Sequence, residues 1–147
     1  MRSLENRESL DKILVVTNNR ILAEQGKYPV DFVEVTPVDV LVRVILLLQS
    51  GYRFVSAPLP PGVSAMRAPF RSFLLEKSDE KYDIAGIEVV EKTRKAMVKQ
   101  RMIGGAQDEV ERDALDKVED FALIDGECLE RAVRDYLLIA GDLDKED

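Results

Sequence analysis

A helix start between two β-branched segments is the sequence feature that most restricts the fold. Thr36 suits the helix N-cap, Pro37 suits the first helical position, and Asp39 favours the positive end of the helix dipole. The helix that these residues predict runs to about Leu48 and is apolar nearly all round, so we expect it to be buried on more than one side. β-Branched segments at 30–35 and 52–56 flank it, and together they predict a βαβ unit with two parallel strands.

Further elements follow from the spacing of apolar residues. We expect strands at 12–17 and 70–76, a short helical turn at 20–25, and helices at 84–102, 107–120 and 126–140. Asp125 is the expected N-cap of the last helix and Gly141 its end. The predicted fold is α/β, with a small, mostly parallel sheet that contains a βαβ unit and with a helical C-terminal third.

The length of 147 residues is typical of one domain. We expect an N-terminal extension at 1–11, a single α/β domain at 12–141 and an acidic tail at 142–147. The C-terminal part, 107–147, holds 15 acids and 5 bases, a local net charge of −10 within an overall net charge of −7. Such an acidic surface argues against nucleic acid as a partner, although solvation of helices is its commoner role.

The composition excludes several function classes. The chain has no histidine and one cysteine, which rules out most catalytic triads, histidine-ligated zinc sites and an intramolecular disulfide. No apolar run approaches the roughly 20 residues that span a membrane, and the N-terminus has no signal-peptide core. We therefore expect a cytoplasmic protein without a membrane segment.

Polar residues at the end of the first predicted strand form one candidate ligand site. Thr17, Asn18 and Asn19 follow the strand at 12–17, and ligands of open α/β sheets bind beyond the carboxyl ends of strands. Ser56, at the end of another predicted strand, is expected nearby. The competing interpretation is that the asparagines only cap the strand and form a turn.

The proline-rich segment 57–69 and the start of the next strand form a second candidate site. Serine hydroxyls can donate hydrogen bonds to an anion, and arginine can bind carboxylate or phosphate with two. The residues of interest are Ser64, Arg67, Arg71 and Ser72. The segment has no phosphate-loop motif, and it could equally be a rigid connection whose arginines pair with nearby acids.

Two further features favour structural roles. Cys128 lies among acids, which oppose formation of a thiolate, so we expect an inert thiol. The acids Asp113, Asp116, Glu119 and Asp120 lie at helical spacing but lack a calcium-loop pattern, and a solvated helix surface is expected there. We predict neither a metal nor a cofactor.

Four short motifs, in order, resemble the GrdX family, small proteins encoded beside the glycine reductase genes of amino-acid-fermenting anaerobic bacteria. The motifs are Val16 to Asn19, Gly51 to Leu59, Pro69 to Ser72 and Asp120 to Asp125. The resemblance covers about residues 12–140. It implies no established activity, substrate or cofactor. Family members often carry histidine where this chain has Tyr52 and Ala57.

Two function classes remain from the sequence. The first is a non-catalytic accessory or regulatory protein of glycine reductase-type metabolism, which binds a small anionic or amino-acid-like ligand or a partner protein. The second is a small enzyme, a transferase or hydrolase, that acts on a phosphorylated or carboxylated metabolite through Asp, Glu, Lys or Tyr instead of histidine. A self-associating protein that dimerises through the apolar helix at 38–48 is a third alternative.

Overall fold

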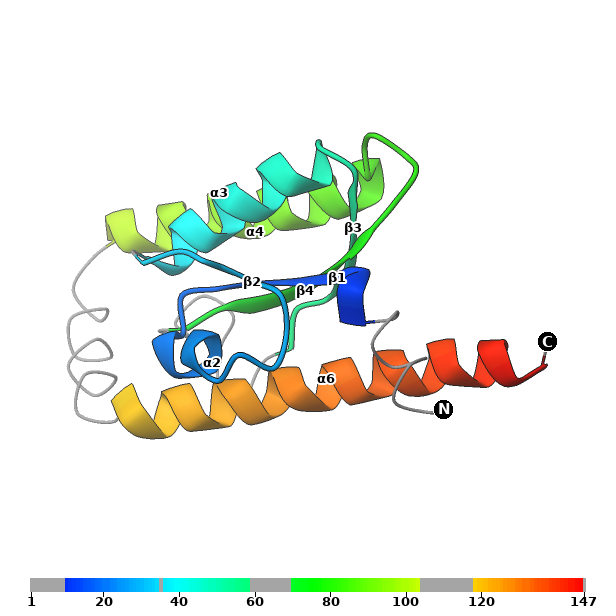
Figure 1. The fold of residues 1–147 in the computed structure, drawn as a ribbon. Coiled ribbons are helices and arrows are strands. Elements are labelled where there is room, and N and C mark those ends of the chain that lie inside the picture. Colours follow the sequence, from blue (N-terminus) through cyan, green and yellow to red (C-terminus); the bar gives the residue numbers. More distant parts are fainter. Residues whose placement is uncertain (1–9, 35, 59–69, 104–117, 147) are drawn as a thin grey trace.

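A four-stranded sheet with helices on both faces forms the body of the protein (Figure 1). The computed structural model describes residues 10–34, 36–58, 70–103 and 118–146. Its elements are β1 (Ile13–Thr17), α2 (Arg20–Glu24), β2 (Val30–Phe32), α3 (Pro37–Leu48), β3 (Tyr52–Ser56), β4 (Ser72–Lys77), α4 (Ile84–Ile103) and α6 (Val118–Glu146). Of the predicted extension at 1–11 only residues 10 and 11 are described, and of the predicted helix at 107–120 only 118–120.

The sheet is mixed, which corrects the prediction of a mostly parallel one. Its strand order is β2-β1-β4-β3. β1 pairs in parallel with β2, whereas β4 runs antiparallel to both β1 and β3. The predicted βαβ unit is therefore only partly present, because β2 and β3 flank α3 in sequence but lie at opposite edges of the sheet. The parallel pair that does form is β1 and β2, connected through the short helix α2.

The burial of each strand explains this order. The two central strands, β1 and β4, are almost entirely buried, and Phe73, Leu74 and Leu75 make β4 a continuous apolar run. A strand with that composition needs cover on both faces and a neighbour on both sides. The edge strands β2 and β3 carry mainly half-buried side chains. Strand β4 therefore takes a central place between β1 and β3, although it comes last in sequence.

Helices α3 and α4 cover one face of the sheet, and α2 and α6 cover the other (Figure 1). We call these the α3 face and the α6 face. Side chains of a strand alternate between faces. Val16, Phe73 and Leu75 therefore meet α3 and α4, whereas Ile13, Val15 and Leu74 meet Leu129 and Val133 of α6.

The start of α3 matches the prediction in detail. The Thr36 hydroxyl accepts a hydrogen bond from the Asp39 backbone N–H at 3.3 Å, and the Asp39 carboxylate accepts one from the Thr36 N–H at 3.1 Å. This capping box satisfies two backbone donors at once, and Pro37 opens the helix. After α3, Gly51 adopts a φ of +96°, which favours glycine, and leads the chain into β3.

The C-terminal helix differs from the prediction. A single helix, α6, passes through Asp125, Gly126 and Gly141, where a helix start and a helix end were expected. A glycine inside a helix costs only about 1 kcal/mol, which contacts of its neighbours can offset. Asp125 makes such contacts, described below. No helix in the ranges listed above combines the length and the apolar character needed to cross a membrane.

Candidate functional site

Five buried polar side chains meet where α6 crosses the end of the central strands. They are Thr17, Asn19, Arg71, Ser72 and Asp125, and each is at most 4% exposed. We call them the polar cluster. Thr17 is the last residue of β1 and Ser72 the first of β4, and the two are paired across the sheet. Since Thr17 follows Ile13 and Val15 at alternating positions, its side chain continues the row that faces α6.

Hydrogen bonds connect the cluster through the carboxylate of Asp125. Its Oδ2 accepts from the Ser72 hydroxyl at 2.7 Å and from Nδ2 of Asn19 at 2.9 Å. The hydroxyls of Ser72 and Thr17 are hydrogen-bonded to each other at 2.8 Å. The network therefore joins β1, β4 and α6 at one point.

Asn19 connects the network to α2 as well. Its Oδ1 accepts a weak hydrogen bond from the Leu22 N–H at 3.5 Å, so Asn19 is the N-cap of α2, whereas the sequence suggested only a cap of the preceding strand. Its Nδ2 also donates to the carbonyl of Ala122 at 2.8 Å, in addition to Asp125. One amide thus serves both helices of the α6 face.

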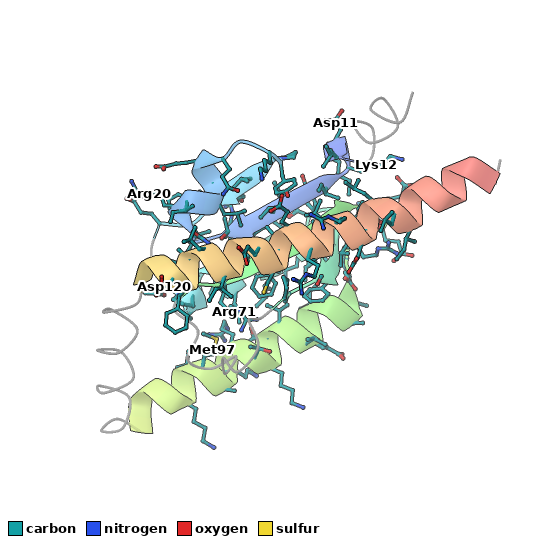
Figure 2. The ribbon with its side chains drawn as sticks, turned by 90° about the horizontal axis from the view of Figure 1, so that it is seen from below. Asp11, Lys12, Arg20, Arg71, Met97 and Asp120 are labelled. Carbon is teal, nitrogen blue, oxygen red and sulfur yellow. The ribbon has the colours of Figure 1, made fainter. Side chains whose placement is uncertain are left out.

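Arg71 brings a positive charge beside the network. Its backbone N–H donates to Oδ1 of Asn18 at 2.8 Å, and its guanidinium lies over the Phe73 ring, 5.1 Å from the centroid. Figure 2, in which α6 crosses in front, labels Arg71 beside that helix and Arg20 near α2. Arg20 also lies over a phenylalanine, 5.6 Å from the Phe32 centroid, but its side chain is 62% exposed. Arg20 is ion-paired with Glu34 at 2.9 Å at the surface, whereas Arg71 is buried.

Burial shifts the ionisation of both charged members of the cluster. It raises the pKa of the Asp125 carboxyl, although the hydrogen bonds from Ser72 and Asn19 and the charge of Arg71 oppose the shift. It lowers the pKa of the Arg71 guanidinium, which the charge of Asp125 opposes. The second carboxylate oxygen of Asp125, Oδ1, is buried and has no hydrogen-bond partner among the described residues. A buried acceptor without a hydrogen bond lowers the stability of a protein, so its presence here needs an explanation.

The structure brings together most of the residues predicted for the site. Thr17, Asn18, Asn19, Arg71 and Ser72 come from the two separate candidate motifs and meet at one point. Ser56 does not join them, because β3 is the far edge strand and Ser56 pairs with Leu74. Ser64 and Arg67 lie outside the described residues.

Asp125 is a member of the site that was not predicted from the sequence. It was expected to cap a helix, yet it lies inside α6 on the stripe formed by Ala122, Leu129 and Val133, which are all buried. Asp125 lies three positions after Ala122, four before Leu129 and eight before Val133, which is the spacing of one helix face. An acid at an apolar position of a continuous helix is the signal that could have found it.

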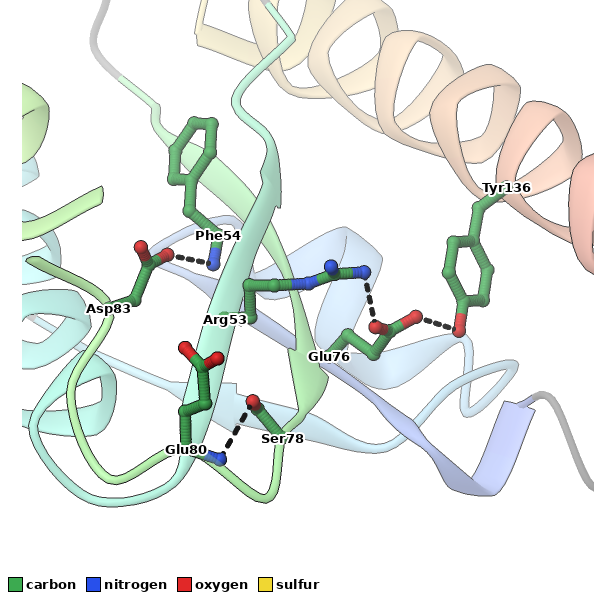
Figure 3. Close-up of polar contacts among 7 residues, drawn as sticks. All are labelled: Arg53, Phe54, Glu76, Ser78, Glu80, Asp83 and Tyr136. Carbon is green, nitrogen blue, oxygen red and sulfur yellow. Dashed lines mark hydrogen bonds and ion pairs between the residues drawn. The ribbon is translucent and has the colours of Figure 1, made fainter. Parts of the chain in front are cut away.

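A second polar contact holds α6 to the sheet farther along the helix. Glu76 of β4 accepts a hydrogen bond from the Tyr136 hydroxyl and pairs with Arg53 of β3 at 2.6 Å (Figure 3). Burial and the adjacent Glu76 raise the pKa of the Tyr136 hydroxyl, so it stays protonated as the donor. Arg53 is 59% exposed, so this contact lies at the rim of the fold, unlike the polar cluster.

Other candidates do not extend the site. Burial and the negative charge of Asp125 raise the pKa of the Cys128 thiol, which opposes nucleophilic reactivity as expected from the sequence. Within the described ranges no group of three or more Cys, Asp or Glu side chains could hold a metal ion. Tyr52 and Ala57 pack against the apolar core of the α3 face.

Comparison of the chain with known protein families identifies the family to which it belongs. No curated protein and no solved structure shows significant similarity to the chain. A family model described as GrdX-like protein matches residues 14–134, a span that contains most of β1, all of β4 and the cluster residue Asp125. This match covers most of the chain, and the protein therefore belongs to the GrdX family.

Proposed function

We propose that the protein is a non-catalytic accessory protein that binds a small anionic or amino-acid-like metabolite at the polar cluster. The observation that carries this proposal is a buried Arg71 guanidinium beside a buried carboxylate with one oxygen unused within the described residues. Ionisable groups with shifted pKa values gather at binding sites, because burial that costs stability is retained where it serves a ligand. The family resemblance supports a role in glycine reductase-type metabolism.

The position of the cluster supports the proposal as well. It lies at the carboxyl end of β1, and ligands of open α/β sheets bind beyond strand ends of this kind. Hydroxyl, amide and guanidinium groups converge there, and these are the groups that orient polar ligands. Arg71 and Asp125 are 4% and 2% exposed, so entry of a ligand requires a local displacement of the chain around them.

A thermal-shift screen of the purified protein tests the proposal. The probes are inorganic phosphate, nucleotides, acetyl phosphate and individual amino acids. A compound at about 100 times its dissociation constant stabilises a protein by about 2.7 kcal/mol. For a chain of this length each kcal/mol raises the melting temperature by about 2–4 °C, so a bound compound is readily detected.

Two arginine variants locate the binding site. Arg71→Gln should abolish the shift, because it removes the buried charge. Arg20→Gln is the matched control, since Arg20 also lies over a phenylalanine ring but is exposed, and it should leave the shift unchanged. Equal loss of the shift in both variants, or no shift with any probe, would contradict a small-molecule site at the cluster. The second result would favour a partner protein instead.

A second candidate function is catalytic, and the raised pKa of Asp125 favours it. The Ser72 hydroxyl donates to Asp125 at 2.7 Å, so this carboxylate is placed to accept the hydroxyl proton. A hydrolase of acetyl phosphate would use Ser72 in this way. Release of phosphate at equal rates by wild type and Ser72→Ala would exclude this candidate.

A further inference from the structure

A cavity of about 320 Å³ lies on the α6 face of the protein. It forms where the residue Leu10, shortly before β1, and the connection between α2 and β2 meet the middle of α6. None of the five residues of the polar cluster lines it. Its volume is at the lower end of the range of small-molecule sites, about 300–1,000 Å³, so it suits a small ligand.

Most of the cavity wall is apolar. Val133 is buried, and Leu10 and Leu137 are half-buried against the same apolar core. Leu138 also lines the cavity, yet it is 59% exposed. An apolar group in the cavity would cover this leucine, and each methylene group that leaves water favours binding. The wall therefore indicates a ligand with an apolar body.

The charges around the cavity leave one positive charge without a partner. Glu130 lines the cavity but pairs with Lys27 at 3.1 Å, so its charge is already compensated. Arg134 lines it one helical turn farther on and forms no ion pair within the part of the chain that the structure describes. One surplus positive charge favours a monoanion, since Glu130 would repel a dianion such as phosphate more strongly.

The Tyr28 hydroxyl adds a neutral donor beside Arg134. Burial and the charge of Glu130 raise the pKa of this hydroxyl and Arg134 opposes the shift, so the hydroxyl stays protonated and both charges act on it. It has no hydrogen-bond partner within residues 10–34, 36–58, 70–103 and 118–146. A hydroxyl and a guanidinium can donate to the two oxygens of one carboxylate.

We propose that this cavity binds a monocarboxylate with an apolar body. Its carboxylate accepts hydrogen bonds from Arg134 and Tyr28, and its apolar body covers Leu138. The planar guanidinium suits the geometry of a carboxylate. The cavity is separate from the polar cluster, so this inference goes beyond the proposed function and does not depend on it.

Four small probes test the inference by NMR titration of the isotope-labelled protein at about pH 7. Hexanoate has both an apolar body and a carboxylate. Hexanol and hexylammonium keep only the apolar body, and acetate keeps only the carboxylate. Hexanoate should bind at least about 10-fold more tightly than acetate, because its methylene groups leave water. It should bind at least about 5-fold more tightly than hexanol or hexylammonium, because only a carboxylate pairs with Arg134.

Two pairs of exposed positions on α6 locate the site. Arg134→Gln should weaken hexanoate binding at least about 5-fold, whereas Arg131→Gln should leave it unchanged, since Arg131 is an exposed arginine outside the cavity. Leu138→Ala should weaken it at least about 3-fold. Ile139→Ala is the control for that loss, because Ile139 is similarly exposed, at 65%, but does not line the cavity. The melting temperature of each variant establishes that it is folded.

Each outcome supports or overturns the inference. Absence of hexanoate binding would overturn it, as would hexanol or hexylammonium binding as tightly as hexanoate. Unchanged affinity in Arg134→Gln, or equal losses in Arg134→Gln and Arg131→Gln, would overturn recognition of the carboxylate at this cavity. Loss of hexanoate binding in Arg71→Gln alone would overturn it as well, because the carboxylate would then bind at the polar cluster. Probes that shift the melting temperature through Arg71 test the proposed function separately, so either proposal can fail alone.

Discussion

The two faces of the sheet are closed by different kinds of contact. On the α3 face the buried cluster around Val16, Leu41 and Phe73 is apolar, and the buried Arg71 guanidinium lies over the Phe73 ring at its edge. The α6 face has a smaller apolar core, and beside it lies the polar cluster around Asp125. Both faces bury their side chains almost completely, so the difference is one of chemistry.

The two kinds of contact contribute differently to the stability of the fold and to the position of α6. Apolar burial stabilises in proportion to area and has no preferred direction. Hydrogen bonds to Asp125 require its carboxylate at one place, so they fix where α6 lies along the sheet. The α3 face therefore provides stability that many apolar sequences could supply, whereas the α6 face holds one helix in one position beside a charged pair.

The largest effect is expected from a cavity on the α3 face. Leu41 is fully buried between α3 and the sheet, so Leu41→Ala should reduce the free energy of unfolding by about 3–5 kcal/mol. Urea unfolding followed by circular dichroism measures this loss. Leu46→Ala on the same helix is the control, because Leu46 is 51% exposed and should cost less than about 1 kcal/mol. Equal losses would contradict an apolar core beneath α3.

The α3 face is also the part that the sequence predicted best. The Thr36 cap, the extent of α3 and the strand β3 follow from local signals, and α4 matches its expected range within one residue. The order of the strands could not be predicted in this way, because it depends on which strands need cover on both faces. The continuous apolar run Phe73 to Leu75 was the available evidence for a central β4.

Loss of the central carboxylate should be the largest effect on the α6 face. Asp125→Ala leaves the buried donors of Ser72 and Asn19 without their acceptor and removes a negative charge that acts on Arg71. We expect a loss of about 2–4 kcal/mol in unfolding free energy. Asp125→Asn should lose less, since its oxygen can still accept from both. A loss under about 0.5 kcal/mol for Asp125→Ala would show that the cluster does not hold α6.

The polar cluster was only partly visible in the sequence. Thr17, Asn18 and Asn19 were recognised because they end a strand, and Arg71 and Ser72 because they begin one. That these two motifs meet follows from the antiparallel pairing of β1 and β4, which no local pattern specifies. Asp125 was assigned to the N-cap of a separate helix at 126–140, whereas the structure has one continuous helix, α6, that passes through it.

A polar contact at the rim of the α3 face tests how much such contacts stabilise this face. The Asp83 carboxylate accepts from the Gly86 N–H at 3.1 Å at the start of α4 and from the Phe54 N–H at 2.9 Å (Figure 3). A methyl group at Gly86 would overlap this carboxylate and lie 3.0 Å from Cβ of Phe54. Gly86→Ala should therefore cost about 1–3 kcal/mol.

Gly126→Ala is the matched control for that substitution. Gly126 is also helical, but no atom lies within 4 Å of the position of an added methyl group. Alanine is the better helix former, so this variant should be stabilised by up to about 1 kcal/mol. Thermal unfolding of both variants measures the difference. A gain in both would mean that Asp83 tolerates displacement and that the contact adds little to the α3 face.

The pH dependence of stability tests the ionisation of Asp125 on the α6 face. Burial raises the pKa of this carboxyl in the folded protein, so the folded state binds the proton more tightly than the unfolded chain. The stability that this proton contributes is complete below the ordinary pKa, about 4, and is lost as the pH rises through the raised value. Relative to Asp125→Asn, the wild type should therefore lose stability from about pH 4 upward.

Urea unfolding at a series of pH values measures this trend. Asp135→Asn provides the reference, because it removes an exposed acid from the same helix. A difference between wild type and Asp125→Asn that stays constant with pH would contradict the raised pKa. It would mean that ionisation of the buried Asp125 does not lower the free energy of unfolding. The two faces would then differ less in the cost of their buried side chains.

The smallest effect is expected where charge lies at the surface of the α6 face. Lys27 pairs with Glu130 of α6 at 3.1 Å, but their side chains are 49% and 41% exposed. Water and salt screen such a pair, so Lys27→Ala should change the unfolding free energy by less than about 0.5 kcal/mol. Denaturant unfolding at low and high salt measures it. A loss as large as that of Asp125→Ala would show that surface charge holds α6 in place, and the polar cluster could then not be the contact that fixes the helix.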